Sequence, residues 1–400
     1  MLYSLYEAQH TALEPLRYWA ELSRGWFGHP FSPFIYLPLA KRLAASSDLF
    51  LRITGRYEKP QWNIAGTELE VALDKPFCKL IHFRQHVPKK HKVLVVAPLS
   101  GHHSTLVRDT VRSLLAEHDV WVSDWVDARM VPLTAGPFHL ADYVDYVREW
   151  IRLLSPNLHV VSVCQPTVPV LAAVALMAAR RESHAPLTMT MMGGPIDARR
   201  SPTAVNNLAR KKPNSWFQRN LIHRVPPKYP GYMRNVYPGF LQHLGFVAMN
   251  PDRHLIAHWD YYHRLLQGDG ESAEAHRRFY DEYNAVLDMP AEYYLDTVKT
   301  VFQDYALPKG RMLVREELVR PQAITSSALF TIEGELDDIS GNGQTEAAHA
   351  LCLNIPRERR SHYVAPGVGH YGIFSGRRWR EMVFPKVREF IARSASLPRR

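Results

Sequence analysis

The positions of apolar residues predict alternating strands and helices through the first half of the chain. Short apolar runs rich in β-branched residues occur at 67–73, 78–83, 92–99, 120–126, 158–164 and 187–194. Several of them are separated by stretches with helical spacing, such as 104–118 and 142–154. Strands of this length that alternate with helices are typical of a largely parallel sheet covered on both faces. The pattern therefore predicts an α/β fold.

This alternation stops after Asp197 and returns with apolar runs at 326–336 and 361–369. The intervening residues 197–320 are rich in aromatics and have helical and turn patterns, so we expect a helical cap (lid) insertion. The core then consists of 66–196 and 321–400, and an aromatic-rich stretch at 1–65 is predicted to form a helical N-terminal segment. A cap inserted between the sixth and seventh strands is typical of the α/β-hydrolase fold.

Residues 160–179 carry no charge over the length of a nominal membrane span. Gln165, Pro166 and Pro169 interrupt the stretch, however, and its composition changes from β-branched to rich in Ala and Leu. A buried strand that turns directly into a buried helix explains this pattern better. We therefore expect no transmembrane segment.

Charge and cysteine content narrow the class of protein further. The net charge is +10 and hydrophobic residues make up 46% of the chain, which allows a sizeable core. The basic residues lie in short dispersed clusters without a known nucleic-acid motif, so no nucleic-acid partner is expected. The 3 cysteines are too few for a disulfide framework. Because the N-terminus has no basic head before an apolar run, it does not read as a secretory signal, and we expect a cytoplasmic protein.

Cys164 stands at the junction of the strand and the helix in 160–179. A sharp strand–turn–helix exposes a nucleophile above the sheet, and the helix N-terminus favours a thiolate. Small residues usually flank such a nucleophile two positions away on either side. Ser162 fits this requirement, whereas Pro166 departs from it. The alternative is a buried structural cysteine.

The other two members of a triad follow in the expected chain order of acid and then base. Asp337 and Asp338 follow the seventh strand, and His370 stands in a glycine-rich loop after the eighth. Neighbouring side chains in extended backbone point in opposite directions, so only one aspartate can face His370. Related acids commonly precede a variable residue and an aliphatic one, and Asp337 has Ile339 in that place. We therefore expect Asp337 to be the acid, with Asp338 as the alternative.

An oxyanion hole requires two backbone N–H groups near the nucleophile. The expected donors are Gln165, directly after Cys164, and Leu99 or Ser100 in the loop after the third strand. His102 and His103 follow in that loop, but no third ligand stands at a suitable spacing, and we expect no metal. No phosphate-binding glycine motif follows a strand, and no cofactor is expected.

Longer strings in the chain resemble one family. The similarity is carried by VLVVAPLSGHHSTLVRDTVRSLL, VSDWVDARMVP, SVCQPTVPVLAA, MMGGPIDAR, GELDDISGNGQT and GHYGIFSGRRWR. These strings resemble the intracellular polyhydroxyalkanoate (polyhydroxybutyrate) depolymerases, and the resemblance extends over nearly the whole chain. It implies an α/β-hydrolase fold with Cys164 as nucleophile, Asp337 as acid and His370 as base. The SVCQP elbow is the form found in that family.

The resemblance also implies a substrate and a location. It suggests cleavage of 3-hydroxyalkanoate ester bonds through a thioester acyl-enzyme, at polyester storage granules in the cytoplasm. Water or coenzyme A could accept the acyl group, and a homo-oligomer is neither predicted nor excluded. Two alternatives are a granule-associated polyester synthase-like acyltransferase and a non-enzymatic granule-binding protein. The synthases typically have GxCxG at the elbow, and three intact triad positions argue against a non-enzymatic protein.

Overall fold

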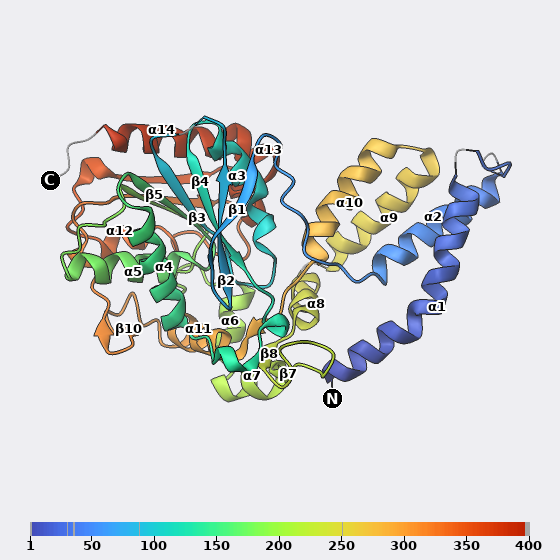
Figure 1. The fold of residues 1–400 in the computed structure, drawn as a ribbon, viewed down its shortest axis with the longest axis horizontal. Coiled ribbons are helices and arrows are strands. Elements are labelled where there is room, and N and C mark those ends of the chain that lie inside the picture. Colours follow the sequence, from blue (N-terminus) through green and yellow to red (C-terminus); the bar gives the residue numbers. More distant parts are fainter. Residues whose placement is uncertain (1, 30, 35–36, 88, 250, 397–400) are drawn as a thin grey trace.

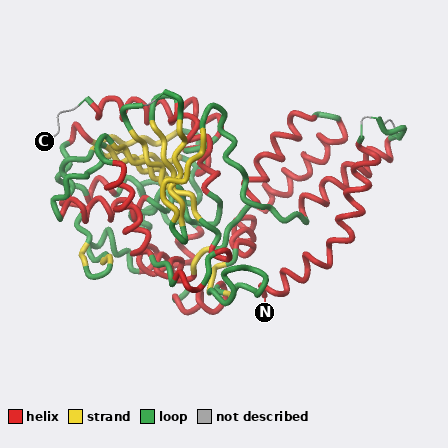
Figure 2. The backbone as a smooth tube through the Cα atoms, viewed as in Figure 1, coloured by secondary structure: helices red, strands yellow, loops and turns green. Residues whose placement is uncertain are grey.

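The computed structural model describes residues 2–29, 31–34, 37–87, 89–249 and 251–396. Its centre is an 8-stranded sheet in the order β1-β2-β4-β3-β5-β6-β12-β13. The strands are β1 (Glu68–Asp74), β2 (Cys78–Arg84), β3 (Lys92–Val96), β4 (Asp119–Trp125), β5 (Leu158–Val163), β6 (Thr188–Met192), β12 (Ala328–Gly334) and β13 (Arg360–Ala365). β2 pairs antiparallel with β1 and β4, and all other neighbours are parallel. Figure 2 shows the strands of this sheet gathered together, with helices around them.

Each face of this sheet packs against helices. α4 (Leu140–Leu154) and α5 (Thr167–Ala179) pack with Leu94 and Val96 of β3 on one face. α3 (Arg108–Leu115) and α14 (Phe384–Ala395) pack with Val93 and Val95 on the other. Successive side chains of β3 thus enter two different cores. A strand buried on both faces must be apolar at every position, which explains the continuous runs in the sequence.

This arrangement confirms the predicted α/β-hydrolase fold. The fold is recognised by the strand order and by β2, which runs antiparallel to its neighbours in an otherwise parallel sheet. The uncharged stretch 160–179 forms the end of β5, a turn and the buried helix α5, as expected. Among the described residues, no helix is long and apolar enough to cross a membrane.

Residues between β6 and β12 form a mainly helical insertion. It contains α6 (Ala204–Lys211), α7 (Asn214–Leu221), α8 (Gly239–Met249), α9 (Pro251–Gln267), α10 (Gly270–Asn284) and α11 (Ala291–Thr297). A small sheet of β7 (His223–Arg224), β8 (Asn235–Tyr237) and β9 (Met289–Pro290) links distant parts of the insertion. Two further short strands, β10 (Leu313–Val314) and β11 (Glu317–Leu318), form a hairpin before β12. Strands of two or three residues carry no alternating pattern, so the sequence did not indicate them.

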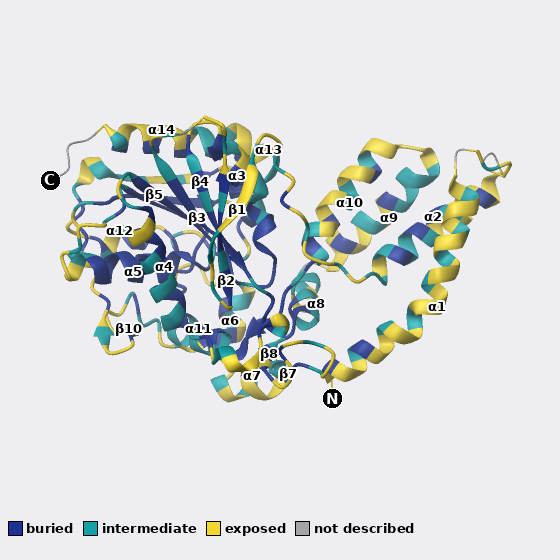
Figure 3. Ribbon diagram, viewed as in Figure 1, coloured by how far each residue is buried: buried dark blue, intermediate teal, exposed yellow. Residues whose placement is uncertain are grey.

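Four helices form an extension, which we call the helical arm, beside the sheet region (Figure 1). It consists of α1 (Leu2–Gly28), α2 (Pro38–Ile53), α9 and α10, with α2 packed between α1 and α9. The arm is tied to the core where α1 begins, because the Tyr3 hydroxyl donates to Asp288 Oδ2 at 2.8 Å. Much of α1 is exposed, whereas the inner strands of the sheet, such as β3 and β5, are buried (Figure 3).

Candidate active site

Cys164 occupies the tight turn between β5 and α5. Its φ of 68° lies in the left-handed region, which non-glycine residues rarely adopt. The Cys164 N–H donates to Met192 O at 2.7 Å, and Thr167 N donates to Cys164 O at 3.2 Å. These bonds hold the strained residue between strand and helix, and its side chain is partly exposed. Such a conformation is characteristic of a nucleophile elbow.

Pro166 fits this turn without difficulty. Its φ of −56° is close to the value that the proline ring imposes, and it precedes the first residue of α5. The close approach in the elbow is instead made possible by Gly194, after β6. A Cβ atom on Gly194 would lie 1.9 Å from Thr167 Oγ1 and 2.6 Å from Cys164 O. The small residue that the elbow needs is therefore Gly194, in the loop after β6. The SVCQP sequence around Cys164 does not contain it, so that sequence alone could not predict it.

Asp337 and His370 meet above the carboxyl ends of β12 and β13. The His370 Nδ1–H donates to Asp337 Oδ2 at 2.7 Å. Asp337 Oδ1 accepts backbone N–H groups from Ile339 at 2.9 Å and Ser340 at 2.8 Å, which fix the carboxylate. Asp337 and His370 are both buried, whereas the neighbouring Asp338 is exposed. The geometry thus joins Asp337, and not Asp338, to the imidazole.

The charge state of His370 depends on its neighbours. Burial alone lowers the pKa of this imidazole, but the charges of Asp337 and Cys164, together with hydrogen bonds to both, raise it well above its ordinary value. A protonated His370 ring can stabilise negative charge on the Cys164 sulfur while Asp337 fixes the ring.

A cavity of about 380 Å³ connects these residues with the insertion. Cys164, His370 and the three expected oxyanion donors Leu99, Ser100 and Gln165 all line it. Most of its remaining wall is apolar and comes from the insertion, including Val205, Leu208, Phe217, Leu221, Tyr294 and Phe302. Cys164 and His370 therefore face a chamber whose wall is mostly apolar. The insertion residues of this chamber were not identified from sequence, because no motif marks them.

The two histidines after Ser100 lie apart from the triad hydrogen bonds. Burial lowers the pKa of His102 to about 4 and that of His103 to about 3. The His102 Nε2–H donates to Tyr283 O at 3.1 Å, and its ring stacks on Phe246. His102 is thus a neutral wall residue of the chamber. Within the described ranges, no group of three or more His, Cys, Asp or Glu side chains could hold a metal ion.

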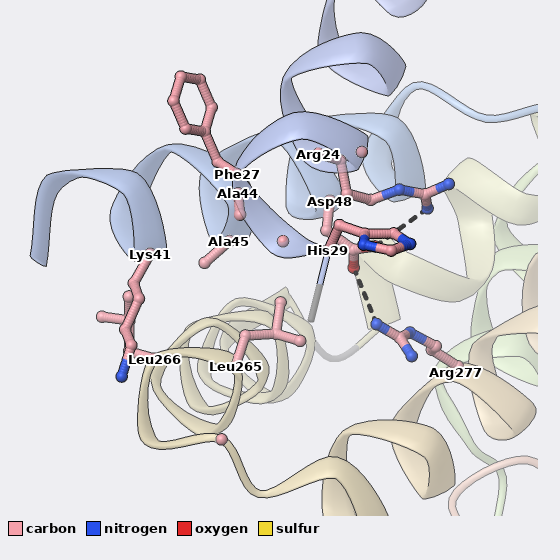
Figure 4. A pocket seen from close by; sticks show the side chains of 13 residues that line it. Arg24, Phe27, His29, Lys41, Ala44, Ala45, Asp48, Leu265, Leu266 and Arg277 are labelled. Carbon is pink, nitrogen blue, oxygen red and sulfur yellow. Dashed lines mark hydrogen bonds and ion pairs between the residues drawn. The ribbon is translucent and has the colours of Figure 1, made fainter. Parts of the chain in front are cut away.

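A second cavity, of about 620 Å³, lies in the helical arm (Figure 4). Arg24 of α1 and Arg277 of α10 point toward Asp48 of α2, at 3.2 Å and 3.6 Å. These ion pairs hold three helices of the arm together. The described lining of this cavity contains no cysteine, serine or threonine nucleophile. Cys164 lines the other cavity.

Comparison with known proteins adds one specific match. The family described as PHB de-polymerase C-terminus matches residues 193–395, a segment that contains Asp337 and His370 and begins after Cys164. No curated protein matches the chain.

Solved structures of similar shape include two ester hydrolases of low identity. One is a Paleococcus ferrophilus monoacylglycerol lipase, at 12% identity and a TM-score of 0.45, covering 82% of this chain and 99% of that one. Another is a thermophilic esterase from Thermogutta terrifontis, at 14% identity and a TM-score of 0.42, covering 86% and 100%.

Proposed function

The chain belongs to the PHB depolymerase family, and on that basis we propose that it cleaves the 3-hydroxyalkanoate ester bonds of storage polyester through Cys164, His370 and Asp337. The observation that carries this proposal is that His370 is hydrogen-bonded to Asp337 and lines one apolar chamber together with Cys164. An apolar chamber suits a polyester, whose repeating units carry alkyl groups and no charge. The family membership itself identifies a carboxylic-ester hydrolase.

The proposed reaction begins with the Cys164 thiolate, which is paired with the His370 imidazolium. The sulfur attacks the ester carbonyl, and the new oxyanion accepts hydrogen bonds from the N–H groups of Gln165 and of Leu99 or Ser100. When the tetrahedral intermediate collapses, the C–O bond breaks and His370 gives its proton to the leaving alcohol oxygen. The product is a 3-hydroxyacyl thioester on Cys164. Asp337 keeps the ring oriented throughout.

The second half of the reaction releases the acyl group. With water as acceptor, His370 takes a proton from the water as it attacks the thioester, and the Cys164 sulfur leaves to yield a free 3-hydroxy acid. With coenzyme A as acceptor, its thiol takes the place of water and the product is a new acyl thioester. The chemistry of the site is the same in both cases.

The proposed location is the surface of polyester granules in the cytoplasm. α1 supports this partner with an exposed apolar stripe at helical spacing, formed by Leu5, Leu16, Trp19, Leu22 and Trp26. Trp19 and Trp26 are each 68% exposed. Exposed apolar stripes of this kind often mark a binding surface. An insoluble apolar polymer is a partner that such a stripe fits.

Incubating the protein with amorphous polyester particles, with and without coenzyme A, tests the proposal. We expect release of soluble 3-hydroxy acid, or of a coenzyme A thioester when that acceptor is present, and neither product from Cys164→Ala. Particle binding without any product would identify a binding protein instead. Polymer growth from 3-hydroxyacyl thioesters would identify a synthase-like acyltransferase.

A further inference from the structure

Five buried polar residues that line the chamber have side-chain atoms without hydrogen-bond partners, namely Gln165, Gln242, Tyr293, Thr297 and Ser340. Gln165, Tyr293 and Thr297 lie near one another, and their unpartnered atoms are both amide heteroatoms of Gln165 and the two hydroxyls. Gln165 is 7% exposed, Tyr293 1% and Thr297 7%. Buried polar groups in folded proteins nearly always have a partner. Three such residues near one another in one chamber therefore require an explanation.

These side chains lie together next to the nucleophile. Tyr293 and Thr297 are four residues apart on α11, so they share one face of that helix. The Tyr293 hydroxyl lies near the side chains of Thr297 and Gln165, although no well-formed hydrogen bond joins it to either. Gln165 directly follows Cys164 in the chain. Burial, and also negative charge on the Cys164 sulfur, raises the pKa of the Tyr293 hydroxyl. The three residues thus form one polar group, surrounded by apolar walls.

The unpartnered atoms indicate which chemical group of a ligand would satisfy their hydrogen-bonding capacity. The Gln165 amide oxygen can only accept a hydrogen bond, its amide nitrogen can only donate, and the two hydroxyls can do both. A ligand that carries an ether or ester oxygen alone supplies no donor to the Gln165 amide oxygen, which neither neighbouring hydroxyl reaches in a well-formed hydrogen bond. A hydroxyl group both donates and accepts. On an acyl chain attached to Cys164, the 3-hydroxyl is such a group, two carbons from the carbonyl.

We infer that Tyr293, Thr297 and Gln165 form a hydroxyl-binding subsite that selects acyl groups with a free 3-hydroxyl. This inference rests on the proposed ester cleavage and specifies its substrate. An internal unit of a polyester has its 3-oxygen bound in the next ester, so only the hydroxyl-terminal unit satisfies the subsite. The enzyme then favours chain ends and soluble oligomers, and it releases one 3-hydroxyacyl unit in each cycle.

A pair of soluble esters tests the subsite. We compare kcat/KM for the p-nitrophenyl esters of 3-hydroxybutyrate and butyrate, which share a leaving group and differ only in the hydroxyl. The wild-type protein should prefer the hydroxy ester by about 10-fold or more, because a site built to bind a hydroxyl rejects the analogue that lacks it. Tyr293→Phe and Thr297→Val should each lower that ratio by about 10-fold. Tyr146→Phe, the same change on α4 at a residue outside the chamber, should leave the ratio unchanged.

The outcomes separate the subsite from the reaction. Equal kcat/KM for both esters in the wild-type protein, or ratios that Tyr293→Phe and Thr297→Val leave intact, would overturn the subsite and leave ester cleavage standing. Cleavage of neither ester would overturn the proposed function and the subsite with it. Melting temperatures identify a variant that fails to fold, and the nearly isosteric Thr297→Val then carries the test alone.

Discussion

The backbone at Cys164 stores free energy in a conformation that places the sulfur above the sheet. A non-glycine residue at positive φ costs of order 1–3 kcal/mol, and the surrounding structure must hold it in place. Here the bond from Cys164 N to Met192 O and the close approach of Gly194 provide that support. Retention of such strain at one cysteine is expected where a reactive side chain must project from the turn.

Replacing Cys164 with Ala should abolish ester cleavage while changing the free energy of unfolding by no more than about 1 kcal/mol, because the side chain is partly exposed. Cys164→Ser should be strongly impaired, since a hydroxyl is much harder to ionise beside His370 than a thiol. Turnover and thermal melts of both variants check this. Cys352→Ala, at a buried cysteine outside the chamber, is the matched control and should keep its activity. Turnover of Cys164→Ala at the wild-type rate would contradict the mechanism.

Asp337→Asn should reduce kcat by about 10⁴-fold, because an amide disturbs the tautomer of His370. It should also shift the pH profile. The charge of Asp337 is the largest of the effects that raise the pKa of His370, so this pKa should fall when the charge is removed. The ion pair between His370 and Asp337 contributes its full stabilisation below the ordinary histidine pKa of about 6.5. This contribution is lost as pH rises through the raised pKa of His370.

The difference in melting temperature between wild type and Asp337→Asn should therefore be largest below about pH 6.5 and shrink in alkali. Asp338→Asn, at the exposed neighbour, is the control and should have a mild effect on both measurements. An equal loss of kcat in the two variants would contradict the assignment of Asp337.

The core strands, and the loops that carry Cys164, Asp337 and His370, could be located from the sequence because each has a local cause. β5 and β6 are buried on both faces and are apolar at most positions, and Asp337 precedes Ile339 in a recognisable frame. Tyr293 and Thr297 had no such signal. They stand on α11, in an insertion whose aromatics are indistinguishable by pattern from its own core, and only the folded chain brings them to Cys164.

One face of α1 packs on α2, and an apolar stripe of the helix is exposed. On the packed face Arg17 donates to Leu51 O at 3.0 Å, whereas Trp19 and Trp26 are each 68% exposed. Replacing both tryptophans with Ser should lower binding to polyester particles by 10-fold or more, on the basis of about 1.5–3 kcal/mol for each large apolar side chain.

Sedimentation of the protein with particles measures this binding, and hydrolysis of a soluble short ester should be unaffected by the double substitution. Leu153→Ser on α4, at a residue that is 51% exposed, serves as a control for loss of a surface apolar group. Particle binding that survives loss of both tryptophans would show that α1 does not hold the polymer.

At the scale of the whole molecule, a buried carboxylate pair joins the helical arm, the core and the insertion. Asp127 follows β4, Asp288 precedes β9, and Tyr3 reaches Asp288 from α1. Burial, and then repulsion from Asp288, raises the pKa of Asp127 despite the nearby Arg129. Asp127 Oδ1 also accepts the N–H of Asp288, 161 residues away, a contact that no sequence pattern predicts.

Because folding raises the pKa of Asp127, the stability of the protein should depend on pH. A carboxyl group whose pKa is raised on folding stabilises the native state below its unfolded value, about 3.9, and this contribution is lost as pH rises through the folded value. Asp127→Asn removes the titrating group, so its melting temperature should fall less than that of the wild type between about pH 4 and pH 7. Thermal melts across this range test the prediction. Parallel curves for the two proteins would contradict it.

The most direct test of the central claim is the covalent intermediate on Cys164. The protein is mixed with a soluble 3-hydroxybutyrate oligomer, quenched in acid during turnover, digested and examined by mass spectrometry. The mechanism predicts one 3-hydroxyacyl group, bound as a thioester that hydroxylamine removes, on the peptide that contains Cys164, and none in Cys164→Ala. Turnover without this adduct, or an adduct on another residue, would contradict it.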